Sequence, residues 1–96
     1  MSEYIDNLME AITAMHECRC NHFGTEHVKE EHEGELVWEG DVEIFQLEGH
    51  PKANVAYGWG WEDDQKEIQY IGILQVPPVE DAATAVRAAI ASSRFD

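Results

Sequence analysis

One stretch, from Ala53 to Glu62, constrains the fold more than any other part of the sequence. Large and small residues alternate along it: Val55, Tyr57, Trp59 and Trp61 take the odd positions, and Asn54, Ala56, Gly58 and Gly60 the even ones. Successive side chains of a strand point to opposite faces of a sheet, so the pattern predicts one bulky face and one nearly bare face. We interpret the stretch as the central strand of a sheet.

Helical spacing is present near both ends of the chain. The first predicted helix, about 3–17, carries one apolar stripe made of Ile5, Leu8, Met9, Ile12 and Met15. The second, about 82–94, follows Asp81, whose carboxylate is a good N-cap, and it is rich in alanine. A helix lined with alanine can approach a sheet closely. We therefore expect it on the glycine face of the central strand, which leaves the aromatic face for the first helix, solvent or a second subunit.

Alternation predicts three further strands, at about 26–33, 35–48 and 66–76, beside the central one at 53–62. The first is mostly charged and suits an exposed edge. The last is apolar at both parities, which predicts burial on both faces. Within 35–48 the apolar parity switches at Phe45 and Leu47, with Gly40 midway. This switch requires either a bulge or a change of burial, and we favour a bulge.

These elements predict one α+β domain spanning 1–96, with an antiparallel sheet of three to four strands between two helices. We expect both helices in a single layer on the sheet. With three strands, this order resembles that of the double-stranded-RNA-binding fold. That family contacts phosphate through basic side chains, whereas the matching turns and final helix here carry Gly49-His50, Glu80-Asp81 and Arg87. The resemblance extends only to the order of elements and implies no function.

Charge is the feature that bears most on function. Six Lys and Arg face twenty Asp and Glu, a formal net charge of −14. Such a surface repels nucleic acid and anionic lipid, so we expect a basic protein partner and neither direct nucleic-acid nor membrane binding. Glu39, Asp41 and Glu43 share one parity, which spaces them about 6.7 Å apart on one strand face. The predicted partner-binding residues are Glu35, Glu39, Asp41, Glu43, Glu62, Asp63 and Asp64.

Two interpretations fit this acidity. The leading hypothesis is a small non-catalytic binding domain that acts as an inhibitor, an adaptor or a mimic of nucleic acid towards a basic protein surface. A solvated sheet face explains the same pattern without any partner. No nucleophile is paired with a base in a recognisable motif, so we expect no enzymatic activity.

A cluster of metal-ligand residue types gives an alternative function. His16, Cys18, Cys20 and His22 are suitable ligands for Zn²⁺. Their spacing does not match the paired C-x₂₋₄-C pattern of zinc sites, and a frayed helix end with incidental thiols explains them equally. Thiols one residue apart do not suit an unstrained disulfide. We therefore expect reduced cysteines and a cytoplasmic location.

The aromatic row suggests a third interpretation. Tyr57, Trp59 and Trp61 are expected to be core residues, because a small domain must bury its aromatic side chains. If some of them stay exposed, the row predicts a homodimer joined through sheet faces.

Overall fold

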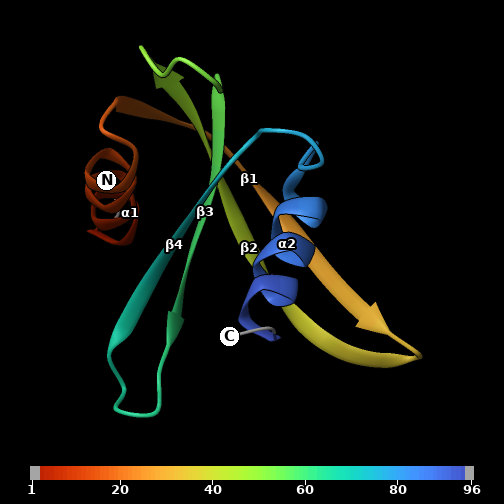
Figure 1. Cartoon of the computed structure of the whole chain (residues 1–96). Helices are drawn as coiled ribbons and strands as arrows, with labels where there is room; N and C mark the ends of the chain where they lie inside the picture. The colour runs from red at the N-terminus through yellow and green to blue at the C-terminus, as the bar shows by residue number, and fades with distance from the viewer. Residues whose placement is uncertain (1–2, 95–96) are drawn as a thin grey trace.

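The computed structural model describes residues 3–94, and its elements follow the predicted order (Figure 1). They are α1 (Glu3–His16), β1 (Arg19–His32), β2 (Glu35–Glu48), β3 (Val55–Glu62), β4 (Ile68–Leu74) and α2 (Ala82–Arg94). The strands form one antiparallel sheet in the order β1-β2-β3-β4. The predicted α+β fold is therefore confirmed with four strands, and the Ala53–Glu62 stretch supplies an internal one. No helix in this range is both long and apolar enough to cross a membrane.

Strand β1 starts earlier than predicted, at Arg19 rather than near residue 26. Glu17 takes a positive φ of 51° and ends α1, and the chain enters the sheet two residues later. Residues 19–25 lack the apolar alternation of a half-buried strand because β1 is an edge strand with most of its side chains in solvent. Cys20 is its buried exception at this end. Gly24 lies within the strand.

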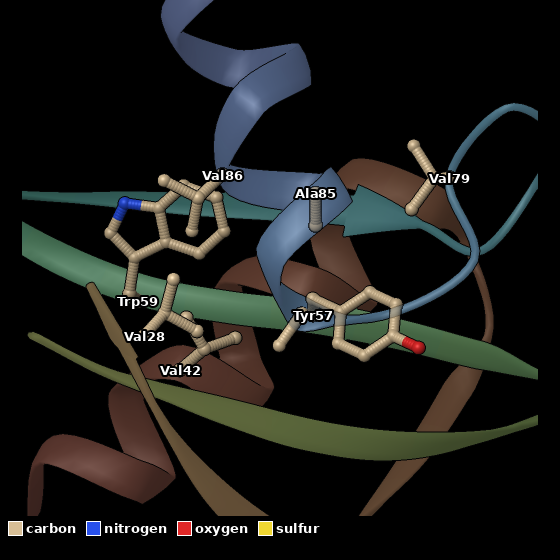
Figure 2. Close-up of a cluster of buried hydrophobic side chains, with 8 residues drawn as sticks. Val28, Val42, Tyr57, Trp59, Val79, Ala85 and Val86 are labelled. Atoms are coloured by element: carbon tan, nitrogen blue, oxygen red, sulfur yellow. The ribbon is translucent and has the colours of Figure 1, made fainter. Parts of the chain in front are cut away.

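The two helices cover opposite faces of the sheet, so the expected single helical layer is not found. On one face, Ala85 and Val86 of α2 lie over the rings of Tyr57 and Trp59 (Figure 2). On the other face, a Cβ added at Gly58 would lie 3.1 Å from Cδ1 of Ile12 in α1. The expected pairing of helices with faces was therefore wrong. Complementary volumes explain the outcome, because the small residues of α2 fit over aromatic rings and the bulky residues of α1 fit over glycines.

The switch of apolar parity in β2 has the same cause. Phe45 and Leu47 belong to a core under α1, together with Leu8 and Ile12, whereas Val42 faces α2. The switch therefore marks a change in which face of β2 carries the buried residues. The predicted bulge does not occur at Gly40. A Cβ at Gly40 would lie 3.1 Å from the Trp38 indole, so this glycine makes room for that ring.

Two bulges do occur between β1 and β2. His22 pairs with Phe45 and Gly24 with Ile44, which leaves Phe23 as an extra residue in β1. The second bulge is in β2. There Glu30 pairs with Trp38 and Glu31 with Leu36, which leaves Val37 as the extra residue.

The sheet divides at one end into two separate hairpins. Within residues 3–94, β2 pairs with β3 only from Glu43 to Gln46, opposite Val55 to Gly58. The β1–β2 ladder nevertheless continues to His32 and Glu35, and the β3–β4 ladder to Glu62 and Ile68. The two hairpin turns consequently lie well apart, as the lower part of Figure 1 shows. We call this divided end of the sheet the fork.

Candidate functional site

The predicted acidic row lies on the α1 face of β2, and His22 and His27 of β1 contact it. Nε2 of His27 lies 2.8 Å from Oε2 of Glu39, and Nδ1 lies 2.9 Å from Oδ1 of Asp41. A neutral imidazole has only one N–H, so two carboxylate contacts favour the doubly protonated ring. The hydrogen bonds to Glu39 and Asp41 raise the pKa of His27, and the bond to His27 lowers the pKa of Glu39.

Glu43, the last member of the row, is buried and serves the fold. Only 5% of its surface is exposed. Its Oε1 accepts a 2.6 Å hydrogen bond from the Thr25 hydroxyl and lies 2.9 Å from Nε2 of His22. A buried carboxylate needs such partners to offset its lost hydration. Glu43 is therefore not available to a macromolecular partner, although Glu39 and Asp41 remain exposed.

The other predicted partner-binding residues lie elsewhere. Glu35 is exposed beside the β1–β2 turn, where it lies opposite His32 in the strand register. Glu62 and Asp64 are exposed at the β3–β4 turn. The predicted residues therefore do not form one continuous surface.

Asp63 holds the β3–β4 turn together. Its Oδ1 accepts hydrogen bonds from the backbone N–H groups of Gln65 and Glu67 at 2.9 and 3.0 Å, and Oδ2 accepts one from the Gln69 amide at 2.9 Å. The bonds from Glu67 and Gln69 are the main causes that lower the pKa of Asp63. This carboxylate therefore shapes the turn, whereas its neighbour Asp64 points to solvent.

Three of the four predicted metal ligands make separate polar contacts, and the fourth, Cys18, packs against the core under α1. His16 lies 3.1 Å from the backbone oxygen of Gly72, and His22 pairs with Glu43. The buried Cys20 thiol donates to the Met9 carbonyl at 3.6 Å, and burial raises its pKa, which disfavours the thiolate that zinc requires. Within the described part of the chain, no group of three or more His, Cys, Asp or Glu residues is arranged to hold a metal ion.

The structure also contains an apolar groove that the sequence did not reveal. We call it the tryptophan groove, and it lies between the fork and α2. Its volume is about 370 Å³, and it is lined by Trp38, Trp59, Trp61, Ile71, Val86, Ala89 and Ile90. The Trp38 and Trp59 rings meet with centroids 5.8 Å apart. A second hollow of about 520 Å³ shares Ile90 and extends the groove towards Glu30 and Arg87.

No family model, curated protein or solved structure matches this chain. The inference of function therefore depends on two features of the molecule, its exposed carboxylates and the tryptophan groove. The carboxylates offer charge to a ligand, and the groove offers apolar surface to be buried.

The sequence did contain one signal for the groove. Trp59 and Trp61 alternate onto one face of β3. Trp38 has the same parity in β2 as Val42, which lies on that face of the sheet. What the sequence did not show was that β2 and β3 separate beyond Glu43, which leaves Trp61 only partly covered, with 45% of its surface exposed.

Proposed function

We propose that this protein is a small, acidic, non-catalytic binding domain that docks on a basic surface of another protein. The observation that carries the proposal is the large excess of carboxylates that stay in solvent. Of the nine between Glu26 and Glu48, all but Glu30 and Glu43 are exposed. A fold of this size does not need a net charge of −14, and a basic partner would complement it.

The contacts within the chain leave much of this charge uncompensated. Lys29 lies 3.6 Å from Glu31, and Arg87 contacts Glu30 at 2.6 Å. None of the ion pairs among the described residues involves Glu35, Glu62 or Asp64. Exposed carboxylates of this kind increase the rate of encounter with a basic protein and repel nucleic acid and anionic membranes.

We place the domain in the cytoplasm. Cys18 and Cys20 are both free, and Cys20 is buried against α1 as a protonated thiol. Two unpaired cysteines in so small a domain are typical of a reducing compartment.

The salt dependence of partner binding tests the proposal. A partner isolated with the protein is expected to be basic, and its affinity should fall at least tenfold between about 0.1 M and about 1 M salt, where the Debye length shrinks from ~10 to ~3 Å. The double variant Glu62→Gln/Asp64→Asn should bind more weakly at low salt and lose part of the salt dependence. An affinity that does not change with salt would contradict the proposal.

A further inference from the structure

We propose that the tryptophan groove binds a basic peptide segment of the partner, with one apolar anchor side chain inserted between Trp61 and α2. The inference rests on the proposed function and specifies which part of a basic partner is recognised. It combines three observations: an open apolar groove, unpaired carboxylates beside it, and a net charge that disfavours the alternative occupants.

The groove is a preformed feature of the fork. Trp38 extends from β2 and Trp59 from β3 at the point where the two strands separate, and their rings meet at an angle of 56°. Val86 of α2 packs against Trp59 and is itself buried, so the floor is fixed by the hydrophobic core. A rigid floor lowers the ordering entropy that binding has to overcome.

Trp61 is the residue left for a ligand to cover. It continues the same face of β3 beyond Trp59 but extends past the main core, and nearly half of its surface is exposed. Tryptophan is enriched among residues that dominate binding energy, because it offers a large rigid surface with little rotamer entropy. An aliphatic or aromatic side chain placed in the groove would remove this exposed apolar area from water.

The carboxylates beside the groove indicate which residues of the peptide should flank its anchor side chain. Asp64 and Glu67 follow Trp61 around the β3–β4 turn and are exposed, with Lys66 as the cation of that turn, whereas Glu62 pairs with Ile68 and lies on the α1 side of the sheet. At the opposite end, the Arg87 guanidinium already contacts Glu30. Lysine or arginine residues next to the anchor are therefore assigned to the β3–β4 turn, where they meet carboxylates that lack an ion-pair partner.

Charge also favours a basic peptide over a second copy of the chain as the ligand of the groove. A homodimer across the groove would bring two surfaces of net charge −14 together. Like charges at an interface are unfavourable and suppress association. The aromatic row is not free for sheet-to-sheet pairing either, because α2 covers Tyr57 and Trp59.

Intrinsic fluorescence reports directly on this site, because all three tryptophans of the protein line the groove. The test uses three peptides without tryptophan at about 0.1 M salt. Lys-Lys-Leu-Phe-Lys-Lys carries the anchor and positive charge, Lys-Lys-Ser-Ser-Lys-Lys carries positive charge alone, and Glu-Glu-Leu-Phe-Glu-Glu carries the anchor with negative charge. Only the first should shift the emission in a saturable way.

Matched variants locate the contact. Trp61→Ser should weaken binding of the first peptide about tenfold, as truncation of a dominant interface aromatic does. Ile68→Ser should leave binding unchanged, because Ile68 is similarly exposed on the same hairpin but faces Gly60 on the α1 side of the sheet. Circular dichroism of both variants shows whether the fold is retained.

The other outcomes overturn the inference in distinguishable ways. Equal binding of both lysine peptides without a fluorescence shift would exclude the groove as the binding site but would still support docking by charge. Equal binding of the acidic anchor peptide would remove the requirement for a basic segment. No shift with any peptide at about 1 mM would exclude the groove as a peptide site. The salt series on the isolated partner would then decide the proposed function separately.

Discussion

The hydroxyl oxygen of Tyr4 accepts a 2.8 Å hydrogen bond from the backbone N–H of Gly60. Gly60 lies in β3 beyond the last residue that pairs with β2. The Tyr4 hydroxyl therefore supplies the acceptor for a backbone N–H in a part of β3 that β2 does not reach. The first turn of α1 thus stabilises the fork from one face, while Trp38 and Trp59 pack together on the other. Burial raises the pKa of Tyr4, which keeps the phenol neutral.

Removing this hydroxyl should destabilise the domain modestly. Tyr4→Phe leaves the Gly60 N–H without its acceptor and should lower the free energy of unfolding by about 1 kcal/mol, or the Tm by several °C. Tyr70→Phe is the matched control, because its hydroxyl has only a longer 3.3 Å contact with the Asn7 amide. Thermal denaturation of the two variants checks this prediction. An equal Tm for Tyr4→Phe and the wild type would show that the bond contributes little.

Glycine at position 58 should be required by packing. A Cβ there would lie 3.1 Å from both Ile12 Cδ1 and Phe45 Cε2, and 3.4 Å from the Ile71 carbonyl oxygen. Gly58→Ala should therefore destabilise the fold by about 1–3 kcal/mol, as overpacking does. Gly24→Ala places its Cβ in open space and should be neutral or slightly stabilising. Urea denaturation of the pair checks the difference, and equal midpoints would contradict the close approach of α1.

The His27 bridge should make stability depend on pH. The pKa of His27 is raised above 6.5, so its contribution is complete below about pH 6.5 and is lost as the pH rises through the folded-state pKa. The pKa of Glu39 is lowered below 4.5, so its contribution is complete above about pH 4.5 and is lost as the pH falls through the folded-state pKa. The bridge should therefore stabilise most between these limits.

The variant His27→Gln isolates this bridge. The difference in urea midpoint between wild type and variant should be larger near pH 5.5 than near pH 8, because the pKa of His27 is raised from 6.5 by its carboxylate partners and the charge of the ring is lost as the pH rises. Lys29, the other cation that lowers the pKa of Glu39, is unchanged in the variant. A difference that grows towards pH 8 would show that neutral rather than protonated His27 makes the contact.

Two neighbouring aspartates should have separate roles. Asp63→Ala removes the acceptor for Gln65, Glu67 and Gln69 and should lower the Tm. Since the pKa of Asp63 is lowered, its contribution should also fall as acid protonates it. Asp64→Ala should leave the Tm unchanged and weaken binding of the basic peptide. The reverse assignment would contradict the account of the turn.

Local patterns predicted the elements of this fold well. Helical spacing located α1 and α2, and alternation in β3 placed Tyr57 and Trp59 on one face and Gly58 on the other. These features depend on neighbours in sequence. The choice of helix for each face was not predicted, because it depends on how side-chain volumes combine across elements such as Ile12 and Gly58, which are distant in sequence.

The site was less predictable for the same reason. The parity that groups Glu39 with Asp41 was visible, but their contact with His27 depends on the register of β1 against β2, which the Phe23 bulge shifts on one side and the Val37 bulge on the other. The groove depends on where β2 leaves β3, and no short stretch of sequence records that point.

The placement of the helices is the claim on which the groove and the peptide site depend, and nuclear Overhauser effects test it directly. We predict cross-peaks from the Ile12 δ1 methyl to the Gly58 α protons, and from the Val86 methyls to the Trp59 ring. Cross-peaks from Val86 to Gly58 instead would put α2 on the glycine face and contradict the account.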